Sequence, residues 1–172
     1  AAARGGYTTV CSMPNLNPAP DTPQTLRAQT DIIRRDAVVR VVPYGCITMG
    51  QRGCGRLVDF AALAPEVVGF SDDGRGVQSD GLMEEAMRRA AQVGKPVVAH
   101  CEVDDLLRGG YIHDGEYCLR TGIRASVRKA SGGRWNAISR LRKRPAASTM
   151  SAMCRPVRAS NWYAAPRPGA CA

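Results

Sequence analysis

Short apolar runs alternate with helical patterns over the first two thirds of this 172-residue chain, and this alternation is what most constrains the fold. The clearest unit spans residues 67–102. It contains an apolar run, a helical pattern from about Asp80 to Val93, and a second apolar run over Pro96–Ala99. Strand, helix, strand in this order predicts parallel strands joined by a right-handed crossover. We therefore expect an α/β fold.

The same alternation precedes this unit. Residues 8–13 and 38–42 are expected as strands, and residues 21–35 and 56–64 as helices, the second of them stopped by Pro65. Four such units fill about half of a (β/α)8 barrel of roughly 250 residues, or they form a small open sheet. After them, residues 104–108 read as a helical turn and residues 109–115 as a loop. The chain has no GxGxxG or Walker pattern, which argues against the common nucleotide-binding versions of these folds.

Polar residues follow three of the expected strands. Asn15 follows the first, Asp72 and Asp73 end the apolar run of the central unit, and His100 follows the next strand. The carboxyl ends of parallel strands meet at one edge, where ligands and metals bind. An Asp and a His presented there suit a cation such as zinc. Simpler readings remain open, with Asn15 a turn residue, His100 a hydrogen-bonded core group, and either aspartate the ligand.

The charge of the chain is unevenly distributed. Residues 1–122 carry a net charge of −2, whereas residues 123–172 carry +11 and contain no acidic residue. A basic tail is typical of nucleic-acid binding, and binding by this one would be non-specific. The seven cysteines are an odd number without CxxC spacing, which favours reduced thiols and a cytoplasmic protein. No apolar run is long enough to cross a membrane, and no signal peptide is visible.

Four segments carry a resemblance to a known family, and they occur in that family's order: GGYTTVCSMPNLNP, VVGFSDDGRGVQ, GKPVVAHCE and GGYIHDGEY. Together they resemble the bacterial-type dihydroorotases of the amidohydrolase superfamily, over residues 1–122. The resemblance implies part of a metal-dependent (β/α)8 TIM barrel. It also implies the reversible cyclisation of N-carbamoyl-L-aspartate to L-dihydroorotate in pyrimidine biosynthesis.

The resemblance also implies roles for individual residues. Asp73 matches the carboxylate that bridges two zinc ions, His100 a ligand of one zinc, and Asn15 a residue that binds the substrate's carboxylate. Glu102 and Asp104 are candidates for orienting a ligand. The family's HxH zinc ligands would precede this sequence and its catalytic Asp would follow it. Only part of the binuclear zinc site is therefore expected here, with no catalytic residue within the chain.

The resemblance stops near Gly122. Residues 123–172 lack helical or strand periodicity, and we expect them to be a non-native, disordered or weakly structured tail. Suitable codons read one base out of frame from Gly122 spell HPGICPESEW and later YHVCHVS, which resemble the family's continuation. A frameshift near residues 121–123 is therefore predicted. It would leave a barrel fragment, residues 1–122, with an open sheet edge and without activity as printed.

Two alternatives accompany this interpretation. One is a non-catalytic dihydroorotase-like subunit that scaffolds aspartate transcarbamoylase. The other is a different cyclic amidase, such as a hydantoinase or allantoinase. The expected partners are a small-molecule substrate, carbamoyl-aspartate or dihydroorotate, with the transcarbamoylase and a homodimer of the intact family member as further candidates. No specific nucleic acid and no membrane are expected.

Overall fold

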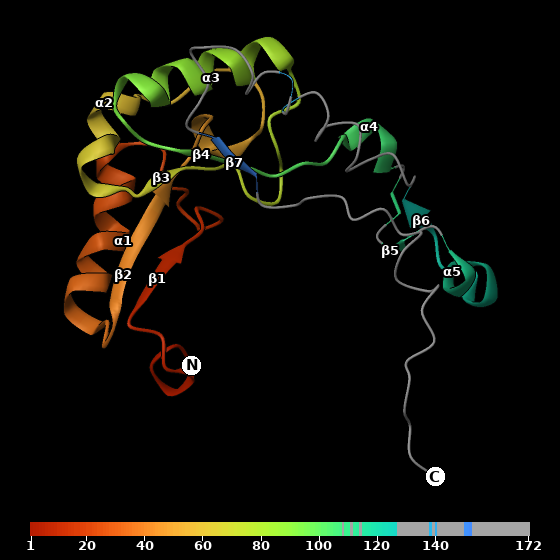
Figure 1. The fold of residues 1–172 in the computed structure, drawn as a ribbon, viewed down its shortest axis with the longest axis horizontal. Helices are drawn as coiled ribbons and strands as arrows, with labels where there is room; N and C mark the ends of the chain where they lie inside the picture. The colour runs from red at the N-terminus through yellow and green to blue at the C-terminus, as the bar shows by residue number, and fades with distance from the viewer. Residues whose placement is uncertain are drawn as a thin grey trace.

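The computed structural model describes residues 1–107, 109–110, 112–113, 115–126, 138, 140 and 150–152. Five parallel strands form one curved sheet in the order β1-β2-β3-β4-β7 (Figure 1). Neighbouring strands of this sheet pair in parallel, as the strand–helix alternation predicted. The strands are β1 (Thr9–Ser12), β2 (Arg40–Gly45), β3 (Gly69–Phe70), β4 (Val97–Ala99) and β7 (Met150–Ala152).

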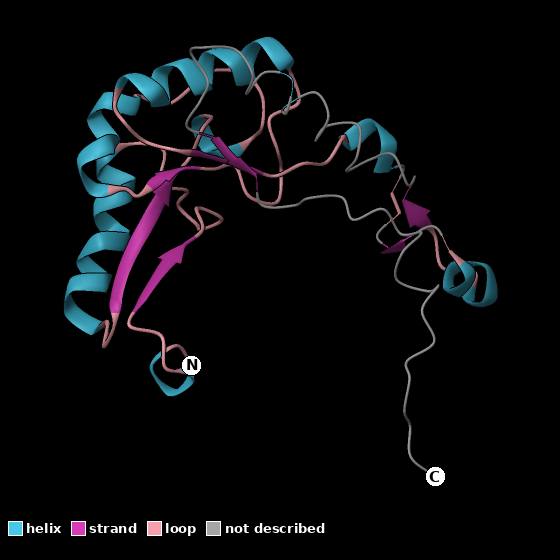
Figure 2. Cartoon of the chain, in the orientation of Figure 1, coloured by secondary structure: helices cyan, strands magenta, loops and turns pink. Residues whose placement is uncertain are grey.

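Helices cover the outer, convex side of this sheet (Figure 2). They are α1 (Pro23–Asp36), the short α2 (Phe60–Leu63) with the 3-10 turn η3 (Ala64–Glu66), and α3 (Asp80–Gln92). Further 3-10 turns are η1 (Ala3–Gly5) and η2 (Met49–Gln51). One layer of helices around a curved parallel sheet is the architecture of part of a (β/α)8 barrel.

The helices α1 and α3 begin close to the residues at which the sequence predicts a helix start. The Thr22 hydroxyl accepts a hydrogen bond from the Thr25 backbone N–H, and Pro23 occupies the first turn of α1. At α3 the Ser79 hydroxyl accepts from the Leu82 N–H. These caps satisfy backbone donors that have no partner within the helix, so both helices begin where the sequence predicts.

The core lies between the helices and the sheet. Met83, Ala86, Met87 and Ala90 form the buried face of α3, and they belong to the same cluster as Phe70 of β3. The rings of Phe60 and Phe70 lie 4.3 Å apart between centroids, in a tilted arrangement. Their burial anchors the carboxyl end of β3, the strand that leads into the two aspartates.

Two local expectations were wrong. The helix expected from Arg56 begins only at Phe60, because Leu57 bridges to Thr48 and the Val58 N–H donates to the carbonyl of Ile47. Asp59 then caps α2. Within the expected loop at residues 109–115, strand β5 (Ile112–His113) pairs with β6 (Ala125–Ser126). This small sheet is accompanied by α4 (Asp104–Leu107) and α5 (Glu116–Thr121).

The sheet edge expected to be open is paired over three residues. Strand β7, Met150–Ala152, lies parallel to β4 in register with Val97–Ala99. Ile138, another described residue beyond position 122, is fully buried in the core cluster. The prediction of a disordered tail concerns residues that lie mostly outside the described ones. Within the described part of the chain, no helix is both long and apolar enough to cross a bilayer.

Candidate metal centre

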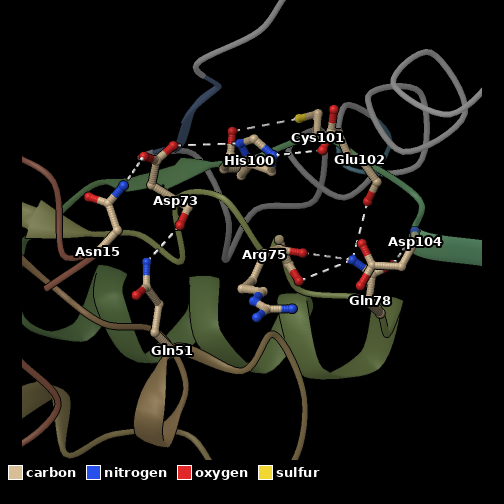
Figure 3. Close-up of polar contacts among 11 residues, drawn as sticks. Asn15, Gln51, Asp73, Arg75, Gln78, His100, Cys101, Glu102 and Asp104 are labelled. Atoms are coloured by element: carbon tan, nitrogen blue, oxygen red, sulfur yellow. Dashed lines mark hydrogen bonds and ion pairs between the residues drawn. The ribbon is translucent and has the colours of Figure 1, made fainter. Parts of the chain in front are cut away.

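The three site residues predicted from the sequence lie close together at the carboxyl edge of the sheet. Asn15 follows β1, Asp73 follows β3, and His100 directly follows β4. Figure 3 shows these side chains in a row that continues to Glu102. Parallel strands bring their carboxyl ends to one edge, so residues up to 85 positions apart in sequence meet there.

Each neighbour in this row is within contact distance of the next. Asn15 Nδ2 donates a hydrogen bond to Asp73 Oδ2 at 3.2 Å. Asp73 Oδ1 lies 3.5 Å from His100 Nδ1. His100 Nε2 lies 3.0 Å from a Glu102 carboxylate oxygen. The side chains of Asp73 and His100 are 17% and 18% exposed, so the pair is shielded while it still reaches solvent.

The Asp73–His100 pair has the geometry of two ligands of one cation. His100 Nδ1 is buried and makes no hydrogen bond within the described part of the chain, which is costly for a polar atom. In a tetrahedral zinc site with bonds of about 2.0–2.2 Å, neighbouring ligand atoms are roughly 3.4 Å apart. The measured separation of 3.5 Å fits that value. A divalent cation bound by Asp73 Oδ1 would give Nδ1 its missing partner.

Glu102 completes the surroundings of the histidine. Its carboxylate at Nε2 favours a proton on that nitrogen, which leaves Nδ1 free as a lone-pair donor. The contact is the one that an orienting role for Glu102 would require. The other candidate, Asp104, contributes its backbone N–H to Gln78 Oε1 instead.

The two adjacent aspartates differ, which the sequence left undecided. Asp72 is fully buried and accepts hydrogen bonds from the backbone N–H of Ile47 at 2.8 Å and from the Thr48 hydroxyl at 2.5 Å. The Thr48 N–H also points at both carboxylate oxygens. Burial raises the pKa of Asp72, and these hydrogen bonds oppose the rise. Asp72 anchors the loop after β2, so Asp73 is the carboxylate available to a ligand.

Two further contacts at this site were not anticipated. Gln51 Nε2 donates to the Asp73 backbone carbonyl at 2.6 Å and holds the turn that carries the carboxylate. Gly76 has a φ of +65°, and a Cβ there would lie 2.6 Å from the His100 carbonyl oxygen. The turn after β3 can approach the end of β4 only because Gly76 has no side chain. The string DDGRG already contains this glycine, but its contact is visible only in three dimensions.

The described residues contain no group of three or more His, Cys, Asp or Glu placed to hold a metal ion together. The pair Asp73 and His100 thus has no third such residue beside it among those described. Catalytic zinc sites use three protein ligands and an open position, so the pair alone is an incomplete ligand set.

Comparison with known proteins decides the family. The sequence model of the family described as "Dihydro-orotase-like" matches residues 1–131. The chain belongs to this dihydroorotase-like family. It is 52% identical over 124 residues to the dihydroorotase of Fusobacterium nucleatum and 52% identical over 125 residues to that of Bacillus caldolyticus. Each match covers 72% of this chain and 29% of the relative, so the chain spans less than a third of the relatives' length.

A solved structure supports the fold assignment. The L-hydantoinase (dihydropyrimidinase) of Arthrobacter aurescens superimposes with a TM-score of 0.61, over 83% of this chain and 33% of that one. The two are 17% identical, so this similarity concerns the fold. The dihydroorotase-like chain is thus an α/β segment with the fold of part of a (β/α)8 barrel, as its motifs implied.

Proposed function

We propose that this chain carries part of the metal centre and substrate site of a zinc-dependent dihydroorotase. The observation that carries the proposal is the 3.5 Å approach of Asp73 to His100 Nδ1, a buried atom that makes no hydrogen bond to any described residue, in a member of the dihydroorotase-like family. Asp73 and His100 would hold the metal, and Asp73 has a second carboxylate oxygen for a neighbouring ion. Bound there, zinc would supply Lewis-acid polarisation of a carbonyl and a lowered pKa for water.

Asn15 would bind the carboxylate of carbamoyl-aspartate or dihydroorotate. Its amide nitrogen carries two hydrogens, and one of them is directed at Asp73. The other can be donated to an anionic oxygen of the substrate, which would place the substrate next to the metal ligands. A directed donor of this kind fixes the orientation of the reacting group before the chemical step.

The reaction itself needs groups that this chain does not supply among its described residues. Two metal ligands are fewer than the three of a catalytic zinc site. We therefore expect the 172-residue chain to show no ring opening of dihydroorotate and no ring closure of carbamoyl-aspartate. The function would belong to the full-length protein, in which the remaining ligands and the family's catalytic Asp are present.

We also propose that residues 123–172 are read out of frame. Two observations support this: the family match ends at residue 131, soon after the predicted break, and residues 123–172 contain no acidic residue. Sequencing the gene across codons 110–180 tests the proposal. A one-base change that restores ESEW and CHVS is expected. A reading frame that stands as printed would overturn it.

The test of function uses the frame-restored, full-length protein. Zinc content and turnover of dihydroorotate are measured for the wild type, Asp73→Asn and His100→Asn. Both substitutions should lower zinc content and abolish turnover, whereas the surface change Gln92→Glu should leave both unchanged. Full activity of the two site variants would contradict the proposal.

The fold neighbour keeps a second cyclic amidase activity under consideration. That neighbour is an L-hydantoinase (dihydropyrimidinase). A substrate panel with a hydantoin, a dihydropyrimidine and dihydroorotate separates the activities. Turnover of hydantoin without dihydroorotate would overturn our choice. Co-purification with aspartate transcarbamoylase, without zinc, would instead support the scaffolding subunit.

A further inference from the structure

Gln78 connects the loops that carry the two candidate metal ligands. Its Nε2 lies 3.0 Å from the carbonyl oxygen of Arg75 and 3.2 Å from that of Glu102. Its Oε1 accepts a hydrogen bond from the backbone N–H of Asp104 at 3.1 Å. Figure 3 shows this amide between the two loops. One side chain therefore bonds the turn after Asp73 and the segment after His100.

The same residue reaches a third loop, and its Nε2 lies near a third carbonyl oxygen. Its backbone N–H donates to the carbonyl of Gly53 at 3.0 Å, in the loop after β2. Its Nε2 also lies 3.1 Å from the Gly76 carbonyl oxygen. The loops after β2, β3 and β4 are thus joined at Gln78. This residue lies directly before Ser79, the residue that caps the start of α3.

An amide is the group that this position requires. Three carbonyl oxygens surround Nε2, so the nitrogen must be a donor, while the Asp104 N–H requires an acceptor at Oε1. A glutamate of the same shape has no hydrogen to donate at neutral pH and would direct negative charge at the carbonyls. A methionine of similar length would remove both interactions.

We propose that Gln78 is a positioning residue that sets the separation of Asp73 and His100. The inference rests on the proposed function, because the separation matters when the two residues bind one metal ion. Ligand pairs must be held within about 0.5 Å of the productive geometry. Arg75 and Glu102 each lie two residues beyond a candidate ligand, so a hydrogen-bonded link between them fixes the distance across the site.

The first test needs no metal. Hydrogen–deuterium exchange is measured on the full chain for the wild type, Gln78→Glu, Gln78→Met and the control Gln92→Glu, which makes the same chemical change at an exposed position on α3. The two Gln78 variants should speed exchange of the Asp104 amide and of segment 73–77 by about tenfold. Exchange like that of the control would overturn the inference.

The second test measures the binding of cobalt(II), with no other metal present. Binding is monitored by the visible absorption of the bound cobalt ion. Gln78→Glu should weaken cobalt binding by about tenfold or more and shift the absorption bands. Leu26→Ala, on the buried face of α1, should lower overall stability without shifting the bands. This separates positioning from general destabilisation. If Gln78→Glu has the same cobalt absorption bands and the same cobalt affinity as Gln92→Glu, the inference is overturned.

The outcomes distinguish this inference from the proposed function. Asp73→Asn should abolish the cobalt signal. If the wild type binds no cobalt through Asp73, the proposed metal function of this chain fails, and the link made by Gln78 is decided by the exchange experiment. If the wild type binds cobalt and Gln78 can be replaced without effect in both experiments, the inference fails and the function stands.

Discussion

Asp72 and Asp73 are neighbours in sequence, but their surroundings are opposite. The carboxylate of Asp72 is fully buried and surrounded by hydrogen-bond donors from Ile47 and Thr48. The carboxylate of Asp73 faces Asn15 and His100 at a partly open edge. The first is saturated by the protein and the second retains capacity for a ligand.

This difference shows how one turn can combine a carboxylate that stabilises the fold with one to which the proposed function assigns a metal. A carboxylate that anchors a loop must have its oxygens satisfied inside the protein, because a buried charge without partners is strongly destabilising. A carboxylate that binds a metal must keep an oxygen free. Placing the two side by side lets the anchor at Asp72 hold the backbone from which Asp73 projects.

The largest expected effect separates the two aspartates directly. Asp72→Ala should lower the free energy of unfolding by about 3 kcal/mol or more, because two backbone N–H groups and a hydroxyl lose a buried acceptor. Asp73→Ala should cost about 1 kcal/mol or less, since its carboxylate accepts one weak hydrogen bond. Urea denaturation followed by circular dichroism measures both. Equal losses would remove the distinction between anchor and ligand.

The next effect tests the approach of the turn to His100. Gly76→Ala should cost roughly 2 kcal/mol, because the residue has a positive φ and a Cβ would collide with the His100 carbonyl. Gly74→Ala is the matched control, since Gly74 also has a positive φ but open space around it. The control should cost about 1 kcal/mol. Thermal denaturation of both variants gives the difference, and a larger loss for Gly74→Ala would contradict this explanation.

A smaller effect is expected at the hydroxyl that supports the anchor. The Thr48 hydroxyl donates to Asp72 and accepts from the Gly53 N–H at 2.9 Å. Thr48→Val should cost about 1 to 2 kcal/mol, because it leaves both partners buried with one bond fewer. Thr48→Ser keeps the hydroxyl and should retain more of the stability in urea denaturation. If the two variants are equally stable, the hydroxyl does not support Asp72.

The smallest effect concerns a carboxylate whose pKa moves in the opposite direction from that of Asp72. Arg88 and Arg89 lower the pKa of Glu85 to about 2 by hydrogen bonding. Its contribution to stability is therefore complete above about pH 4.5 and is lost as the pH falls toward about 2. Glu85→Gln should be slightly less stable than the wild type at pH 7 and equal to it near pH 2. Urea denaturation at several pH values measures this, and a pH-independent difference would contradict it.

Asp72 has the reverse dependence. Because burial raises its pKa in the folded protein, its contribution favours folding at low pH and declines as the pH rises from 3.8 through the raised value. As the pH rises, the contribution of Glu85 to stability therefore increases, whereas that of Asp72 decreases. The pH dependence of Glu85, which lies in an exposed ion pair, is therefore the reference for the pH dependence of the buried Asp72.

The order of strands and helices could be predicted from the sequence because it depends on local patterns. Apolar runs, the helix start near Thr22–Pro23 and the helix expected from about Asp80 depend on patterns of a few residues, and the structure confirms them. Local patterns failed where distant segments compete for the backbone. Residues 57 and 58 are held by Thr48 and Ile47, so the helix expected from Arg56 starts later.

Some features of the candidate site could likewise be predicted from the sequence, and others could not. Sequence motifs alone carried the resemblance to the dihydroorotase family, and that resemblance singled out Asn15, Asp73 and His100, because motif residues are visible in a linear string. Only the tertiary structure decided which aspartate is the anchor, that Gly76 must pass the His100 carbonyl, and that Gln78 joins three loops. Those properties arise from distances between segments far apart in the chain. A sequence records neighbours along the backbone, whereas burial and hydrogen bonding across the sheet edge are set by packing.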